Sequence, residues 1–306
     1  MTATSQPSSA THAGPGVLSG KVAVVTGASR GIGKGTATVL AERGATVYVT
    51  ARTINPGGHA LPGSLEETVV HCAERGAANG GKAVAHALDL GDDEAIAALF
   101  ARVKAEQGRL DILVNNAMAI PPEMTSKLPF WEKPLTNWEI FDTGLRAAFI
   151  AAHHAAKLMV ESGAGLIVGM SGYVGRTYTY DVIFGTTKTA TDRMARDMAV
   201  ELRSHGVASV SLWQGFTLTE RAIENLKSVP GMASQLNSAA GSSPEFPGRV
   251  IAALAGDPKL MAKSGGSFIA AELAAEYGIT DRDDKVIPSL RESRGAPIFM
   301  PIGENV

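Results

Sequence analysis

The sequence has almost no cysteine and no long apolar run. Its single cysteine, Cys72, excludes a disulfide framework and a cysteine-based zinc site, and it suits a reducing compartment. No apolar stretch approaches the ~20 residues of a membrane span. The N-terminus also lacks the basic and apolar regions of a signal peptide. We therefore expect a cytoplasmic protein that is not embedded in a membrane.

The sequence also has no large excess of positive or negative charge. The 28 basic and 30 acidic residues give a net charge of −2, with no basic stripe that could grip nucleic acid or an anionic membrane. The adjacent His153 and His154 fall on a helical pattern, where neighbours point in different directions. We expect no metal site, and a small molecule is the expected partner.

Length and composition predict one large domain. The chain has 306 residues, of which 45% are hydrophobic and 19% charged, as in ordinary globular proteins. Residues 1–18 are rich in Ser, Thr, Ala, Gly and Pro, which predicts a flexible N-terminal arm. Residues 19–306 are predicted to form the domain.

A glycine-rich turn organises the domain. Residues 22–26 form an apolar, strand-length run, and a helical pattern follows the turn. Gly27 lets the chain turn, Gly31 lets backbone approach a phosphate, and Gly33 lets the helix pack on the strand. The free N–H groups and the dipole of such a helix attract a pyrophosphate. The turn therefore predicts nucleotide binding, although a glycine-rich turn can also bind nothing.

The end of the second strand, residues 45–50, indicates which dinucleotide binds. Sites for NAD usually carry a carboxylate there for the ribose 2′-OH, but this chain has Thr50, Ala51 and Arg52. Arg52 and Arg30 can both pair with a 2′-phosphate, so we predict NADP(H). The alternative is that both arginines are solvated surface residues.

Strands and helices alternate along the rest of the chain, which predicts an α/β fold with a Rossmann-type doubly wound parallel sheet. Two long helices are expected over residues 137–160 and 183–204. The segments 119–137 and 220–247 are rich in apolar residues, Pro, Gly or Ser, and we predict that they form the substrate pocket or a lid.

Several of these residues together resemble the short-chain dehydrogenases/reductases. The matching motifs are Thr26-Gly27-x-x-x-Gly31-x-Gly33, Asp89-Leu90, Asn115-Asn116-Ala117 and Lys188. Features such as Phe130-Trp131-Glu132, Ser211-Leu212-Trp213 and Tyr277-Gly278 are similar to the dehydrogenase/reductase member 1 type within that family.

The resemblance implies a set of cofactor contacts. Asp89 and Leu90 would border adenine (Asp89 could equally be a loop acid), Asn116 and Ala117 would line the ribose, and Lys188 would bind the nicotinamide ribose. The loop 215–219 would meet the carboxamide and a phosphate. With the glycine turn and the arginines, the predicted cofactor residues are Gly27, Ser29, Arg30, Gly31, Ile32, Gly33, Arg52, Asp89, Leu90, Asn116, Ala117, Lys188, Gly215, Thr217 and Thr219.

The catalytic positions depart from the family pattern. The family has Tyr-x-x-x-Lys on a helix, where the ammonium lowers the phenol pKa and the phenol exchanges a proton with the substrate. Here Phe184 stands at the tyrosine and Lys188 at the lysine, while the family serine falls on Gly172, beside Ser171. The predicted substrate contacts are Met118, Trp131, Tyr173, Phe184 and Phe216.

Three explanations of Phe184 stay open. The chain carries a Tyr→Phe change made to trap a complex, or the enzyme transfers hydride without this acid, to an iminium or a conjugated C=C. In the third, the protein binds cofactor without turnover. We predict an NADP(H)-dependent oxidoreductase of a small to medium apolar carbonyl, imine or enone, with a cofactor-binding pseudoenzyme as the alternative. The resemblance also implies a homodimer or homotetramer built on the two long helices, whose close approach the alanines Ala147, Ala148, Ala151 and Ala155 would allow.

Overall fold

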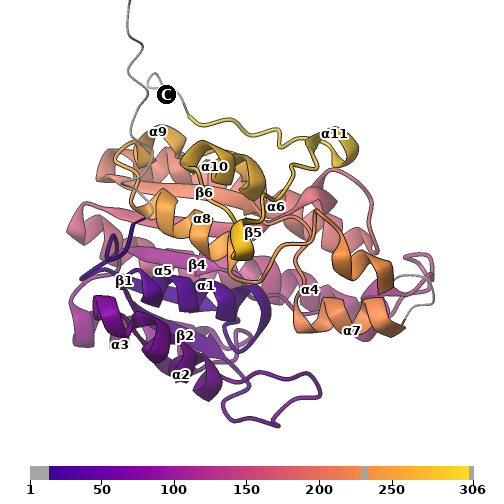
Figure 1. Cartoon of the computed structure of the whole chain (residues 1–306), viewed down its shortest axis with the longest axis horizontal. Coiled ribbons are helices and arrows are strands. Elements are labelled where there is room, and N and C mark those ends of the chain that lie inside the picture. Colours follow the sequence, from indigo (N-terminus) through magenta and orange to yellow (C-terminus); the bar gives the residue numbers. More distant parts are fainter. Residues whose placement is uncertain (1–13, 229–232, 303–306) are drawn as a thin grey trace, which may run out of the picture.

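A computed structural model describes residues 14–228 and 233–302. Its seven strands are all parallel and lie in the order β3-β2-β1-β4-β5-β6-β7, with helices on both faces (Figure 1). This confirms the predicted doubly wound sheet. The strand order reverses between β1 and β4, which is where such sheets open a crevice at their carboxyl ends. The strands are β1 (Val22–Thr26), β2 (Thr46–Ala51), β3 (Lys82–Ala87), β4 (Ile112–Asn115), β5 (Gly165–Ser171), β6 (Val207–Trp213) and β7 (Ser267–Ile269).

The helices form two layers, each burying its own apolar cluster. Helices α1, α2, α8 and α10 cover one face, and α3, α5 and part of α6 cover the other. Their bounds are α1 (Gly31–Glu42), α2 (Leu65–Gly76), α3 (Asp93–Gln107), α4 (Glu139–Phe141), α5 (Ala147–Ser162), α6 (Val182–Leu202), α7 (Glu220–Ser228), α8 (Phe246–Ala255), α9 (Leu260–Lys263), α10 (Ala270–Tyr277) and α11 (Arg291–Arg294). No helix of the described part is long and apolar enough to cross a membrane.

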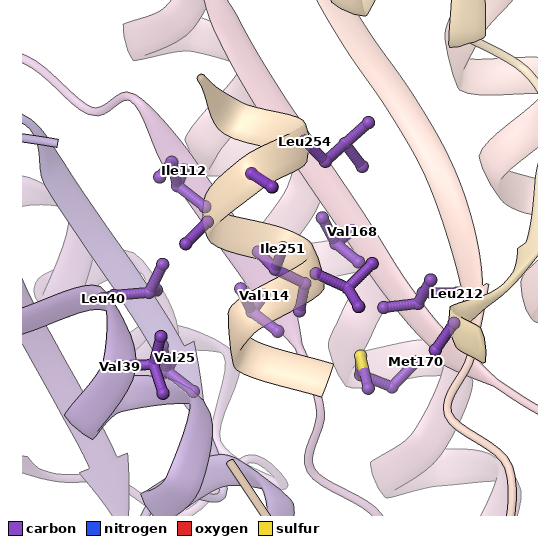
Figure 2. Packing of buried hydrophobic residues seen from close by; sticks show 14 of the residues in the cluster. Val25, Val39, Leu40, Ile112, Val114, Val168, Met170, Leu212, Ile251 and Leu254 are labelled. Carbon is purple, nitrogen blue, oxygen red and sulfur yellow. The ribbon is translucent and has the colours of Figure 1, made fainter. Parts of the chain in front are cut away.

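Helix α8 packs across the middle of the sheet and beside α1. Figure 2 shows Ile251 and Leu254 above the strand side chains. Glycine permits the approach of the two helices, because a Cβ on Gly248 of α8 would lie 2.7 Å from the Thr36 Cα of α1. The first and the last third of the chain therefore share one apolar core.

The helix ends follow local sequence rules. The carboxylate of Asp92 accepts a hydrogen bond from the Ala95 N–H at 3.0 Å, and Gly108 ends α3 in the left-handed region. Helix α1 has no such side-chain cap on Arg30. Its first N–H groups are thus left for another acceptor.

The helix expected over residues 137–160 contains a wide π-turn, Asp142–Arg146, between α4 and α5, and it continues to Ser162. At the start of the domain, Leu18 is only 1% exposed and donates its N–H to the Arg43 carbonyl, so this end of the predicted arm docks on the domain. Residues 1–13 of the predicted arm lie outside the described residues.

The alanine face of α5 points into the protein, whereas a contact between subunits would require it to be exposed. Its four alanines are buried within the chain, where they pack on the sheet: Ala147, Ala148, Ala151 and Ala155. They are therefore unavailable for contact with a second copy.

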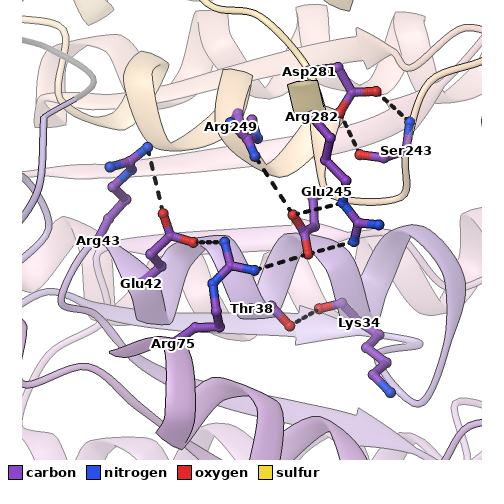
Figure 3. A network of polar contacts seen from close by, with 10 residues as sticks. All are labelled: Lys34, Thr38, Glu42, Arg43, Arg75, Ser243, Glu245, Arg249, Asp281 and Arg282. Atoms are coloured by element: carbon purple, nitrogen blue, oxygen red, sulfur yellow. Dashed lines mark hydrogen bonds and ion pairs between the residues drawn. The ribbon is translucent and has the colours of Figure 1, made fainter. Parts of the chain in front are cut away.

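An ionic network ties the segment that follows residue 240 to the first half of the chain (Figure 3). The buried carboxylate of Glu245 faces Arg282 at 2.8 Å, Arg75 at 3.5 Å and Arg249 at 3.8 Å. Ser243 adds hydrogen bonds to the Asp281 carboxylate. The end of the segment 220–247 is thus anchored to the domain.

Candidate active site

A cleft of about 680 Å³ opens at the carboxyl ends of the strands. It runs from the glycine turn after β1 to the first turns of α6. Of the residues singled out from the sequence, those that line it are Gly27, Ser29, Arg30, Gly31, Ile32, Gly33, Arg52, Asp89, Leu90, Asn116, Ala117, Met118, Phe184, Lys188 and Thr219.

The glycine turn is held tightly against the end of β4. Gly27 has a φ of +67°, and a Cβ there would lie 2.9 Å from the Ala117 Cα. A Cβ on Gly33 would lie 2.3 Å from the Gly27 carbonyl oxygen, so the helix can approach the turn only with glycine at this position. The Asn116 side chain donates to the Thr26 carbonyl at 2.9 Å. The turn is therefore shaped before any ligand arrives.

The N-terminus of α1 carries a carboxylate from elsewhere in the chain. Glu220, the first residue of α7, accepts a hydrogen bond from the Gly31 N–H at 2.9 Å. This contact links the glycine turn to the start of the segment 220–247. An anion is thus already favoured at this helix end, as its free N–H groups and dipole require.

One end of the cleft is strongly basic. Arg30 and Arg52 line it together with His59 and Arg221. Burial lowers the pKa of His59, and the charges of Arg30, Arg221 and Arg52 lower it further, so the three guanidinium groups act at one place. Arg30 is also occupied, because it donates to the carbonyl oxygens of Gly63 at 2.9 Å and Pro62 at 3.0 Å.

Asp89, for which the resemblance implies a contact with adenine, lies on the cleft wall. Its carboxylate accepts a hydrogen bond from the Gly91 N–H at 2.9 Å, which shapes the turn after β3. One carboxylate oxygen is thus occupied, and the other has no partner among the described residues.

The other end of the cleft holds Phe184 and Lys188, one helical turn apart on α6. Lys188 is 7% exposed and donates to the Met170 carbonyl oxygen at 2.8 Å. Burial lowers its pKa to about 8, and the charge of Asp192 opposes that shift only in part. The Lys188 ammonium, which can lose its proton near neutral pH, therefore lies one helical turn from the Phe184 ring, which has no hydroxyl group and so no proton to donate.

The structure does not bring Ser171 into the cleft. Its side chain is fully buried and donates to the Lys188 carbonyl oxygen at 3.0 Å. Successive side chains of a strand point to opposite faces, and Met170 is the one that lines the cleft. Gly172 has no side chain, and a Cβ there would meet nothing within 4 Å. Neither residue supplies a hydroxyl group to the site.

Three predicted substrate contacts also lie away from the cleft. Tyr173 is 9% exposed, stacks edge-on against Trp213, and accepts a hydrogen bond from the Leu290 N–H at 3.0 Å. Trp131 is 72% exposed and packs only on its neighbour Phe130. Phe216 is half-buried outside the cleft wall.

Two predicted cofactor residues in the loop after β6 are likewise outside the cleft wall. Thr217 is buried, and its hydroxyl group pairs with that of Ser242 at 3.2 Å. Gly215 has a φ of +78° and serves the turn. Thr219 is the residue of this loop that reaches the cleft.

Sequence reasoning missed several residues that the fold brings in. They are His59, Glu139, Thr143, Gln214, Glu220 and Arg221. Gln214 directly precedes the predicted loop 215–219, and Glu220 and Arg221 directly follow it, at the start of the predicted segment 220–247. Nothing in the sequence marks His59 or Glu139, because the loop 53–64 and the short helix α4 place them.

The comparisons with known proteins agree with this geometry. The short chain dehydrogenase family pattern matches residues 21–229. The chain is 38% identical over 280 residues to dehydrogenase/reductase SDR family member 1 of Mus musculus, covering 88% of this chain and 86% of the relative.

Two solved structures are similar over most of the chain. A putative NAD(P) dependent gluconate 5-dehydrogenase from Beutenbergia cavernae, with bound NADP, has a TM-score of 0.70 at 27% identity, covering 84% of this chain and 97% of that one. A metagenomic short-chain oxidoreductase in complex with NADP has a TM-score of 0.63 at 27% identity, covering 83% and 97%. The glycine turn, the sheet order and these likenesses show that the chain belongs to the short-chain dehydrogenase/reductase family and is an NAD(P)-dependent oxidoreductase by descent.

Proposed function

We propose that the chain is an NADP(H)-dependent oxidoreductase whose cleft binds the dinucleotide from the glycine turn to Lys188. The residues present fit such a group. Gly27 and Gly33 let the turn and the start of α1 close against each other and against the end of β4, where a Cβ would clash. The Gly31 N–H, which donates to Glu220 in this structure, is a donor that a phosphate would take over. The side-chain oxygen of Gln214 is buried without a partner among the described residues, and it would accept a hydrogen bond from a carboxamide.

The basic end of the cleft is the observation that carries the choice of NADP(H). Arg52, Arg221 and His59 surround the place where β2 ends, and no carboxylate follows that strand. Two guanidinium groups suit the dianionic 2′-phosphate, since arginine binds phosphate through paired N–H donors. The NADP bound in two similar structures supports the same choice.

The substrate end of the cleft is mostly apolar. Its wall includes Met118, Ile120, Pro121, Pro122 and Phe184. The reduced nicotinamide supplies a hydride when bound. The protein's part is to hold a small to medium apolar carbonyl, imine or enone against it and to exclude water.

The proposal is tested by NADPH oxidation over a panel of ketones, cyclic iminium ions and enones. NADPH and NADH are compared at equal concentrations, and Phe184→Tyr is run beside the parent chain. We expect turnover with NADPH on at least one class and a weaker response to NADH. Equal use of both cofactors would contradict the assignment of the basic end.

A second candidate function follows from Phe184 and Gly172. Both family groups that handle the proton are missing, so a protein that binds NADPH without turnover is the alternative. It predicts NADPH binding in the parent chain, with no oxidation of NADPH on any class of substrate in either the parent or Phe184→Tyr.

We also propose that the chain forms a homodimer or homotetramer through the outer surfaces of α5 and α6. Large apolar side chains are exposed there although the alanines are not: Phe149 is 55% exposed and Val200 is 48% exposed. Light scattering after size exclusion should give a multiple of the 31.7 kDa chain mass, and a monomer at micromolar concentration would contradict the proposal.

A further inference from the structure

The proton needed for carbonyl reduction has no family donor in this cleft. Phe184 has the ring without the hydroxyl group, Gly172 has no side chain, and the Ser171 hydroxyl group is turned into the protein. The polar side chains on the substrate wall of the cleft are those of Glu139, Thr143, Lys188 and Gln214. Of these, only the Lys188 ammonium is an acid that holds its proton at neutral pH and can release it.

We infer that Lys188 itself is the proton donor of this enzyme, acting on carbonyl substrates in place of the missing phenol. The inference rests on the proposed NADP(H)-dependent function. The carbonyl carbon accepts the hydride and its C=O π-bond breaks, so negative charge gathers on the oxygen. One N–H bond of the ammonium then breaks, and an O–H bond forms. The product is an alcohol, and the neutral amine regains its proton from water.

The position of Lys188 supports this role. Its ammonium donates one hydrogen bond to the Met170 carbonyl oxygen at 2.8 Å, and its two other N–H donors remain for groups in the cleft. It forms no ion pair with any carboxylate of the described residues. Asp192, one turn further along α6, is instead bonded to the Ser211 hydroxyl at 2.7 Å and to the Trp213 indole at 3.1 Å.

The surroundings of Lys188 also set its acidity. On β5, which packs against α6, Lys188 makes hydrogen bonds with Met170 and Ser171, which carry no charge, and Asp192 is the carboxylate that raises its pKa. Glu139 lines the cleft with it. Burial outweighs the charge of Asp192 and lowers the pKa to about 8. A general acid is most efficient when its pKa lies near the working pH.

The experiment compares two substrates that differ in their need for a proton. A ketone needs one on its oxygen, whereas an N-methylated cyclic iminium ion needs none, because hydride transfer alone completes the amine. Lys188→Arg keeps the positive charge, but arginine does not release a proton in this pH range. We expect the rate of ketone reduction to fall on the order of 100-fold. The rate of iminium reduction should fall by about tenfold at most.

Two measurements do not depend on turnover. The affinity of Lys188→Arg for NADPH, measured by calorimetry, should stay within about threefold of the parent, since cation and shape are largely kept. The Lys188 ammonium, followed by NMR in the cofactor-free protein with Lys188→Arg to assign its signal, should titrate with a midpoint near pH 8. A midpoint above 10 would overturn the inference.

The outcomes separate this inference from the proposed function. Equal losses on ketone and iminium would show that Lys188 only positions the cofactor, and would overturn the inference while the oxidoreductase stands. Reduction of iminium but never of ketone by the parent would also overturn it. No turnover of either substrate would refute the proposed function together with the inference. Phe184→Tyr added to Lys188→Arg should regain part of the ketone activity, because the phenol then gives the proton.

Discussion

The carboxylate of Glu220 accepts a hydrogen bond from the Gly31 N–H at 2.9 Å, so the first residue of α7 occupies the N-terminus of α1. A diphosphate that binds this helix end must displace the carboxylate or share the N–H groups with it. The two anions repel each other and compete for the same donors.

Replacing Glu220 with Gln should therefore tighten NADPH binding. We expect a gain of roughly 2- to 5-fold, which corresponds to the ~0.3–1 kcal/mol that one charge is worth at a helix terminus. Calorimetry measures the affinity. Glu224→Gln, an exposed carboxylate on the same helix, serves as the control and should leave the affinity unchanged. Equal affinities for parent and Glu220→Gln would show that the contact does not oppose the cofactor.

Arg52→Ala should separate the two cofactors. Arg52 is exposed at the basic end of the cleft and makes no hydrogen bond within the described residues, so its removal leaves the fold intact. We expect NADPH binding to weaken by about tenfold or more, the loss of one charge-assisted contact, and NADH binding to change little. Arg30→Ala should weaken both cofactors, because Arg30 also holds the loop at Pro62 and Gly63. Similar losses of NADPH and NADH in Arg52→Ala would rule out a 2′-phosphate contact.

Restoring the family proton donors should be possible without repacking. A Cβ on Gly172 meets nothing within 4 Å, and Phe184 already lines the cleft. Phe184→Tyr should raise ketone reduction, by less than the ~10²–10⁴-fold that a general acid contributes where none is present, because Lys188 already supplies a proton. Gly172→Ser should add to that gain. Melting temperatures within about 2 °C of the parent would verify that both variants fold. A folded double variant with no gain would place the carbonyl elsewhere in the cleft.

Lys188 should leave a signature in the pH dependence of stability. Its pKa is lowered from 10.5 to about 8 in the fold, so between those values the unfolded chain holds a proton that the folded chain has released. The free energy of unfolding then rises with pH through this window, by up to ~3 kcal/mol from this group. Urea unfolding at pH 8 and pH 10 should show that rise in the parent relative to Lys188→Met. Parallel curves for the two proteins would contradict a lowered pKa.

Lys133 joins the segment 119–137 to the start of α6. It is 8% exposed, lies 3.0 Å from the Asp181 carboxylate, and donates to the carbonyl oxygens of Met124 and Tyr180. Lys133→Met would leave the Asp181 charge buried and unpaired, at a cost of about 3 kcal/mol. The melting temperature should fall by roughly 6–12 °C. The exposed Lys127→Met should melt like the parent, and Lys133→Met with Asp181→Asn should recover part of the loss.

Much of the fold could be predicted from the sequence because local rules determine it. The glycine turn, the cap at Asp92 and the stop at Gly108 all lie where their residue types require them. The π-turn before α5 could not be predicted, because it depends on packing between distant segments. At Gly144 a Cβ would lie 3.1 Å from Thr187 and 3.2 Å from Met118.

The candidate site was predictable where residues follow a strand, and less so in loops. Asn116 comes directly after β4 and Asp89 two residues after the end of β3, so the topology carries them to the cleft. The short helical turn Tyr173–Gly175 instead directs the Tyr173 ring toward Trp213. Alternation along β5 would have excluded Ser171, since Met170 and Ser171 cannot share a face. Glu220 reaches Gly31 across 189 residues, and no local pattern reports such a contact.

The packing of α8 on α1 has a consequence for the order of folding during synthesis. The first βαβ unit contains the glycine turn, yet one side of α1 is covered only when residues 244–255 arrive, more than two hundred positions later. A nascent chain that stops before Pro244 therefore exposes apolar surface on α1. It also lacks Glu245, whose carboxylate pairs with Arg75 in the complete fold. Domains with such long-range contacts close late, so this chain should acquire cofactor affinity only near the end of its synthesis.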